Sequence, residues 1–457
     1  MLYLGKFRQI YTKNRGETAM LIEFSVANFK SIKDRQTLSM VASKNQEDAN
    51  VRIFSPGSSA GGDDIKLLPA AAIYGANASG KSNLLSALDA IKKTILFSSS
   101  EVQSQGLLWI TPFKLDPATQ NKPTEFEIVF VAGGVRYQYG FSATKERIVE
   151  EWLLAYPQNR AQRWLGRVWA NKKKDYEWLL GANLKGEKNL WKNATRENAL
   201  FLSTAVQFNS RQLSPVYGWF QSTMRKVIQW SEVVPFMNAD TYLTSSLCAE
   251  GDAESVLAFL RNADLDIYDV QTEKLPLDFF RRTKKSSNAM GDAMDNLTTV
   301  SYKELGEKNI YEPKMVHKDI NDNFVVFDLD DESDGTRKVF ALAFYWLTSL
   351  RKGDVLVVDE LHEHLHPKLV QYLVGLFSSK KTNPNNAQLI FATHDTSLMD
   401  QKVLRRDQIW FCEINSHLAT EVYPLTDFHP RKGRGNLRSA YLSGSYGALP
   451  HIKSAHG

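Results

Sequence analysis

The densest group of residues able to do chemistry is a glycine-rich stretch that ends in a lysine and a serine. Gly75-Ala76-Asn77-Ala78-Ser79-Gly80-Lys81-Ser82-Asn83 follows an apolar run that ends at Tyr74, and leucines at helical spacing come after it. Strand, glycine loop and helix form the context of a P-loop, in which backbone N–H groups and a helix N-terminus bind phosphate. We expect Lys81 to reach the β- and γ-phosphates of a nucleotide and the Ser82 hydroxyl to hold Mg²⁺.

A second group is a pair of carboxylates at the end of an apolar run. Residues 355–358 are Val-Leu-Val-Val, which is typical of a strand buried on both faces, and Asp359 and Glu360 follow. Asp359 suits a Mg²⁺ ligand, and Glu360 suits the general base that orients an attacking water. Asp359 lies 278 residues after Lys81, so a large insertion must separate the two motifs.

Two further segments complete the series. Residues 388–393 are predicted to form another buried strand, and His394 at its end is a candidate sensor of the γ-phosphate. Ser333 and Gly335 stand before an apolar pattern at helical spacing, so they begin a helix. A helix start offers free N–H groups, and we expect these to meet the γ-phosphate held by a second copy of the chain. An ordinary cap by Ser333 or Asp334 is the alternative.

Composition excludes several classes of protein. The 457 residues are 43% hydrophobic and 23% charged, which favours a globular chain over a disordered one. The longest apolar stretch is too short to span a bilayer, so we expect a cytoplasmic protein without membrane contact. The two cysteines, Cys248 and Cys412, cannot form a thiolate cluster. A net charge of +5 does not decide whether nucleic acid is bound.

Changes in pattern along the chain suggest its organisation. We expect an N-terminal extension over 1–19, the first half of an ATPase head over 20–195, a helical insertion over 196–300, and the second half over 301–457. Within the first half, two alternating runs around Gly133-Gly134 predict a β-hairpin. Long heptad runs are missing, so extended coiled-coil arms are not expected.

The order of these motifs resembles ABC-type ATPases of the SMC and RecF kind. The segments 72–85 and 359–367, and the ending 441–450, resemble prokaryotic AAA-type ATPases of abortive-infection systems, which are related to OLD proteins. The resemblance implies an α/β fold, an ABC/SMC-like P-loop NTPase head with a β-subdomain and a helical insertion. It also implies ATP and Mg²⁺ as ligands and a homodimer or higher homo-oligomer. The signature departs from Leu-Ser-Gly-Gly-Gln, because residues 332–336 read Glu-Ser-Asp-Gly-Thr.

Several assignments stay open. Gln103 and Gln105 are candidates for the Q-loop glutamine. No sequence motif distinguishes ATP from GTP as the bound nucleotide. His362, His364 and His366 could bind a metal, but we favour a D-loop at a dimer interface, as in the resembling families. The basic clusters 172–174 and 431–434 read as solvated loops, although the second could contact nucleic acid or an acidic partner.

The leading hypothesis is an ATP-hydrolysing sensor or regulator of an anti-phage abortive-infection system. Only 63 residues follow His394, too few for an added nuclease domain, so the toxin or nuclease effector is expected to be a separate protein. The alternative is a RecF/SMC-like DNA-binding repair ATPase, and a nucleotide switch without an effector is a third possibility.

Overall fold

The computed structural model describes residues 19–44, 51–56, 65–100, 106–227, 239–275, 310–429 and 436–450. They belong to two compact units, one made from residues 1–226, 350–361 and 373–457 and the other from residues 227–349 and 362–372. Several segments discussed above lie outside the described residues, namely 1–18, Gln103, Gln105 and 431–434.

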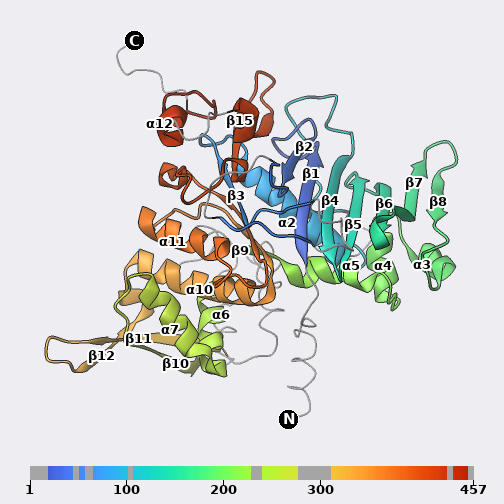
Figure 1. Ribbon diagram of the computed structural model, residues 1–457. Helices are drawn as coiled ribbons and strands as arrows, with labels where there is room; N and C mark the ends of the chain where they lie inside the picture. The colour runs from blue at the N-terminus through green and yellow to red at the C-terminus, as the bar shows by residue number, and fades with distance from the viewer. Residues whose placement is uncertain are drawn as a thin grey trace, which may run out of the picture. The chain divides into compact units, whose positions relative to one another are not determined.

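A six-stranded sheet in the first unit contains the three predicted motif strands (Figure 1). Its order is β16 (Thr420–Pro424), β15 (Ile409–Ile414), β3 (Ala70–Tyr74), β14 (Gln388–Ala392), β13 (Val355–Val358) and β9 (Met224–Val227). β15, β3, β14 and β13 run parallel, and β16 is antiparallel to β15. Every residue of β3, β13 and β14 is buried. That burial explains why these strands are continuous apolar runs without alternation.

A seven-stranded antiparallel sheet forms the expected β-subdomain. Its order is β2 (Gln36–Ser39), β1 (Met20–Ala27), β4 (Thr124–Ala132), β5 (Val135–Ala143), β6 (Ile148–Tyr156), β7 (Gln162–Ala170) and β8 (Asp175–Leu180). The predicted hairpin is confirmed as β4 and β5. Gly133 and Gly134 join them with φ of 57° and 72°, which suits the tight turn that matches strand twist.

Helix α2 (Lys81–Phe97) contacts both sheets, meeting β1 of the antiparallel sheet and β14 of the parallel one. Leu84, Leu88 and Ile91 recur at helical spacing and are buried in one core with Phe126 of β4 and Val357 of β13. The helix that starts at the P-loop lysine is therefore held between two sheets.

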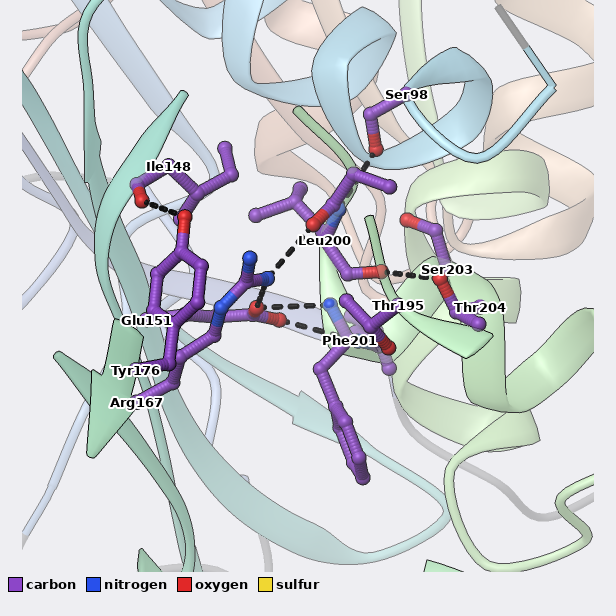
Figure 2. Close-up of polar contacts among 12 residues, drawn as sticks. Ser98, Ile148, Glu151, Arg167, Tyr176, Thr195, Leu200, Phe201, Ser203 and Thr204 are labelled. Atoms are coloured by element: carbon purple, nitrogen blue, oxygen red, sulfur yellow. Dashed lines mark hydrogen bonds and ion pairs between the residues drawn. The ribbon is translucent and has the colours of Figure 1, made fainter. Parts of the chain in front are cut away.

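The outer part of the β-subdomain is fastened by a buried ion pair (Figure 2). Glu151 of β6 and Arg167 of β7 are fully buried, with 3.6 Å between carboxylate and guanidinium. Glu151 accepts hydrogen bonds from the first two N–H groups of α4 (Phe201–Gln207), and Arg167 donates to Ala199 O. The guanidinium also stacks 3.9 Å from the Tyr176 ring centre. Burial raises the pKa of Glu151, and Arg167 opposes that shift.

The remaining helices of the first unit are short. They are α3 (Lys188–Ala194), α5 (Ser214–Gly218) and α12 (Leu437–Leu442), with single turns η3 (Pro157–Asn159), η4 (Trp219–Thr223), η8 (Thr396–Leu398), η9 (Arg406–Gln408) and η10 (Leu425–Phe428). Helix α11 (Pro367–Ser378), whose first six residues belong to the second unit, begins at the proline where the sequence predicts a helix start. Across the described ranges, no helix is long and apolar enough to cross a membrane.

The second unit combines helices with a small sheet. Its elements are α6 (Ala239–Leu247), η6 (Cys248–Asp252), α7 (Ala253–Asn262), β10 (Asp269–Leu275), β11 (Ile310–Lys318), β12 (Phe324–Asp328) and η7 (Leu329–Asp331), and α10 (Asp334–Lys352) follows. The antiparallel sheet has the order β10-β11-β12. The sequence predicts a helical insertion over 196–300, so β9 is a difference in the first sheet and β10 is one in this unit. This strand is defined by pairing with β11, which no local pattern records.

Candidate functional site

The glycine loop is shaped by close contacts that exclude any side chain at its two glycines. A Cβ on Gly75 would lie 2.3 Å from the carbonyl oxygen of Cys412, and one on Gly80 would lie 2.0 Å from Thr420 Oγ1. Gly80 also has φ of 101°, a region that other residues rarely adopt. The sequence motif therefore marks glycines that the local packing requires.

The start of α2 has the features of an anion site. Gly80 caps the helix without a side-chain hydrogen bond, and the first turn has no acidic residue. Ser82 is exposed there, and the buried Ser79 Oγ makes no hydrogen bond within the described structure. First-turn N–H groups and an unsatisfied hydroxyl fit a phosphate group.

Lys81 is folded back over the loop. Its Nζ donates hydrogen bonds to Gly75 O and Ala76 O, both at 2.9 Å. Burial lowers the pKa of Lys81, while the carboxylates of Asp359 and Glu360 are among the groups that raise it. The P-loop lysine and the two predicted carboxylates therefore share one electrostatic environment.

The strand register explains why these groups meet. Val358 at the end of β13 pairs with Phe391 of β14, and Phe391 pairs with Ala72 of β3. The carboxyl ends of the three parallel strands thus reach the same edge of the sheet, where ligands bind in such folds. Asp359 and Glu360 continue β13 at that edge.

Glu360 has an unusual backbone conformation. Its φ is 47°, a left-handed value that costs a non-glycine residue of order 1–3 kcal/mol. Its N–H donates to Asp359 Oδ1 at 3.1 Å. Strain of this kind persists where the surroundings fix the backbone, and it clusters at functional sites.

His394 lies at the same edge, two residues after the end of β14, which is the strand between β3 and β13. The histidine is exposed. Its neighbours are anchored, because Thr393 N donates to Ile73 O and the Tyr74 hydroxyl donates to Asp395 O, both at 3.0 Å. His394 thus stands at the sheet edge that carries the P-loop.

The predicted signature residues belong to the second unit. Ser333 Oγ accepts a hydrogen bond from Thr336 N at 3.1 Å, so Ser333 is the residue that caps α10. A Cβ on Gly335 would lie 3.1 Å from His364 O, and His364 Nδ1 lies 3.9 Å from Asp334 Oδ2. The signature turn therefore packs against the turn that carries His364.

The three histidines 362, 364 and 366 lie in that turn and just before α11. They do not follow the alternation of a strand, so the shared face that a metal site would need is not formed. Among the described residues, no group of three or more His, Cys, Asp or Glu side chains is arranged to hold a metal ion.

The profile of one protein family matches residues 70–178 and 242–400, together more than half of the chain. That family is described as "AAA domain, putative AbiEii toxin, Type IV TA system". The chain belongs to this family. The matched ranges contain the P-loop, the signature turn, Asp359, Glu360 and His394.

Solved structures similar to this AAA-family chain are SMC heads. A SmcHead bound to the C-winged helix domain of ScpA has 14% identity and a TM-score of 0.41, covering 88% of this chain and 96% of its own. An SMC head domain from Thermotoga maritima has 12% identity and a TM-score of 0.36, covering 88% and 98%. A Pyrococcus furiosus Smc head with an extended coiled coil, bound to the C-terminal domain of ScpA, has 14% identity and a TM-score of 0.40, covering 90% and 98%. No curated protein matches the sequence.

Family membership and strand order agree on the fold. The chain contains an AAA domain with a P-loop, and its α/β fold with a β-subdomain is the one that the sequence predicts. The P-loop strand and the Asp-Glu strand are not neighbours, because β14 separates them.

The sequence does not reveal a set of side-chain hydrogen bonds that hold the P-loop in place. Thr420 Oγ1 donates to Ser79 O at 3.0 Å and lies 2.8 Å from Ser31 Oγ, which accepts from Asn83 Nδ2 at 2.7 Å. Ser31 and Thr420 lie outside the ranges that the family profile matches. We name Ser31, Thr420 and Asn83 the P-loop brace.

Proposed function

We propose that the chain binds ATP with Mg²⁺ and hydrolyses it slowly, and that its nucleotide state controls a separate toxin or nuclease of an abortive-infection system. The observation that carries the first part is the arrangement of Lys81, Glu360 and His394 at one edge of the parallel sheet. For the second part, the family description names a toxin and a toxin–antitoxin system, which supports a role in such a system; the assignment of the toxic activity to a separate protein is our own.

Each side chain has a distinct role in this proposal. First-turn N–H groups and Lys81 bind the phosphates, and Ser82 and Asp359 hold Mg²⁺, which neutralises phosphate charge when bound. Glu360 accepts a proton from the attacking water and orients that water. His394 senses the γ-phosphate from the adjacent strand end. The Ser333 turn contacts the γ-phosphate bound by a second copy, so that nucleotide closes a head-to-tail dimer.

Lys81→Ala tests the first part of the proposal, that the chain binds and hydrolyses ATP. Loss of a charge-assisted contact to phosphate should weaken ATP binding roughly 10- to 100-fold and abolish turnover. Calorimetric titration with ATP and with GTP, and phosphate release, are the measurements. Circular dichroism controls for folding, because Lys81 also donates to two loop carbonyls. Turnover equal to that of the wild type in a folded variant would contradict the proposal.

The regulatory half needs a cellular measurement. Cells that carry the gene with its genomic neighbour should restrict phage, and Lys81→Ala should remove that restriction. Co-purification should show whether the product of the neighbouring gene binds the chain. We expect the chain itself to lie in the cytoplasm. DNA-stimulated turnover with salt-sensitive duplex binding would instead favour a RecF/SMC-like repair ATPase. The exposed basic turn 172–174 does not favour that alternative, because Lys173 pairs with Glu177.

A further inference from the structure

Strand β12 of the second unit is an apolar strand that is exposed along its whole length. Its residues are Phe324-Val325-Val326-Phe327-Asp328, and all five are exposed. Phe324 is 58% exposed and Val326 52%, although both are apolar. In Figure 1 the β11–β12 hairpin extends beyond helices α6 and α7 of its own unit. Exposed apolar strands of this kind are avoided unless something pairs with them.

The backbone of β12 is also open on one side. β12 is the last strand of the sheet that the described residues form. Tyr268 N donates to Val316 O, so the polar groups of Val316 face β10, and those of its neighbours in β11 face β12. Val316 is paired in register with Val326. Because hydrogen bonds alternate along an antiparallel ladder, the N–H and C=O of Val326 point to the open edge.

Acidic residues flank the strand at both ends. Between residues 319 and 334 seven side chains are acidic and none is basic. Asp322 and Asp330, one on each side of β12, have side chains that are 84% and 82% exposed, and they pair with Lys318 at 3.0 Å and with Arg337 at 3.6 Å. Hydrogen bonds from Asn323 hold the pKa of Asp319 below its usual range. Lys314, Lys318 and Arg337 each pair with one of these carboxylates, so acidic side chains outnumber the basic ones around the strand. The docking edge, defined as Phe324–Asp328, is thus an apolar strand with an excess of acidic residues at both ends.

The acidic residues at the two ends of β12 indicate which kind of strand could pair with it. A second copy pairing antiparallel through the same edge would set the Asp322 end of one strand against the Asp328–Asp330 end of the other. Like charges opposite each other destabilise strand pairing. A strand with apolar residues at alternate positions and Lys or Arg at both ends would satisfy the open backbone, the exposed side chains and the acidic flanks together.

Side-chain contacts connect the docking edge to the signature turn at Ser333. Asp328 and Asp331 form a capping box across η7, and His317 Nε2 of β11 lies 2.5 Å from Glu332 Oε1. Ser333 follows directly. These contacts connect β11 and β12 to the residues that lead into Ser333, so a shift of β12 would be passed to that turn.

We propose that β12 is the docking edge for an extended, basic-flanked segment of a separate protein, which adds to the sheet as a fourth strand. Through the contacts at Asp331 and Glu332, its occupancy alters the Ser333 turn and so the rate of ATP turnover; this regulatory part rests on the proposed function.

Two synthetic peptides test the docking. Lys-Lys-Val-Thr-Val-Thr-Val-Lys-Lys and its counterpart with Glu for Lys are labelled with fluorescein and titrated with the full chain without nucleotide. The basic peptide should bind roughly tenfold more tightly, with a difference that shrinks in salt because surface charges are screened. Equal binding of both peptides, or binding of neither, would overturn the proposal.

Val326→Pro tests the site itself, with Val326→Thr as the matched control. Proline removes only an N–H that points to the open edge, so β11 pairing should survive, as circular dichroism would show. Loss of one hydrogen bond should weaken binding of the basic peptide about fivefold or more in Val326→Pro, whereas Val326→Thr should bind it as the wild type does. Equal affinity for both folded variants would place the peptide elsewhere.

Two further readouts separate the outcomes. Sedimentation of the chain alone should be unaffected by Val326→Pro, and a loss of self-association in that variant would make a second copy the occupant and contradict the proposal. Saturating basic peptide should change ATP turnover in the wild type. Unchanged turnover with intact peptide binding would remove the regulatory part alone, whereas absent turnover in the peptide-free wild type would count against the proposed function.

Discussion

At the scale of single residues, Glu360 is the side chain on which the proposed hydrolysis depends most directly. Its place beside Asp359 at the sheet edge, with a left-handed backbone, is the reason why we propose it as the base. We expect Glu360→Gln to lower turnover by about 10²- to 10⁴-fold while ATP still binds, because only proton acceptance is lost. Phosphate release and ATP titration measure the two effects. Glu363→Gln in the following turn is the control, and undiminished turnover in Glu360→Gln would assign the base to another group.

Thr420 belongs to the same scale, although it touches no predicted ligand. Thr420→Val keeps the volume but removes the hydroxyl that bonds Ser79 O, so the P-loop should lose alignment. ATP affinity should fall about fivefold, while Thr420→Ser should retain it. If Thr420 had only a structural role, its substitution would lower the melting temperature of the nucleotide-free protein, and the ATP affinities of the valine and serine variants would not differ.

The two kinds of residue differ in how far the sequence could reveal them. Lys81, Ser82, Asp359 and Glu360 stand in contiguous motifs, and each follows a recognisable apolar run, so their positions could be predicted. Thr420 could not, because its partner Ser31 lies 389 residues away and neither residue stands in a motif. The roles assigned to all of these site residues, like those of His394 and Ser333, stay predictions.

At the scale of elements, the Glu151–Arg167 pair fastens α4 to the β-subdomain. Arg167→Met should cost about 3–5 kcal/mol in unfolding free energy at neutral pH, because it leaves a buried carboxylate unpaired. The pKa of Glu151 is already raised by burial and should rise further without Arg167. An acid whose pKa is higher in the folded state stabilises that state below its ordinary pKa, and this contribution is lost as pH rises through the folded value.

Arg167→Met should therefore lose less stability at pH near 5 than at pH near 8, relative to the wild type. Urea unfolding at the two pH values measures this. The double variant Glu151→Gln with Arg167→Met should be less sensitive to pH, since no buried acid remains to titrate. A pH-independent loss in Arg167→Met would show that packing against Tyr176, and not charge pairing, is what the arginine supplies.

The elements differ in the same way as the residues. β3, β13 and β14 are buried on both faces, so their sequences are apolar throughout and were predictable. β10 has Gln271, Thr272, Glu273 and Lys274 in succession, and it becomes a strand only by pairing with β11. Such pairing between distant segments is invisible to local periodicity.

At the scale of the whole molecule, the proposed function requires two chains, because the Ser333 turn is expected to complete the phosphate site of a second copy. Ser333→Asp isolates this role, since aspartate also caps helices and should preserve α10. The added negative charge should repel the γ-phosphate. In the Glu360→Gln background with ATP, we expect a dimer by sedimentation, and Ser333→Asp should prevent it while Ser333→Thr should not.

Mixing variants decides whether the Ser333 turn acts in trans. Lys81→Ala chains lack a working P-loop but keep the signature turn, and Ser333→Asp chains have the opposite defect. Each is expected to be inactive alone. If the dimer is head-to-tail, a mixed dimer contains one site built from the two intact halves, so an equal mixture should recover up to roughly a quarter of wild-type turnover. If each chain used its own Ser333 turn, every site in the mixture would carry a defect and no turnover would return.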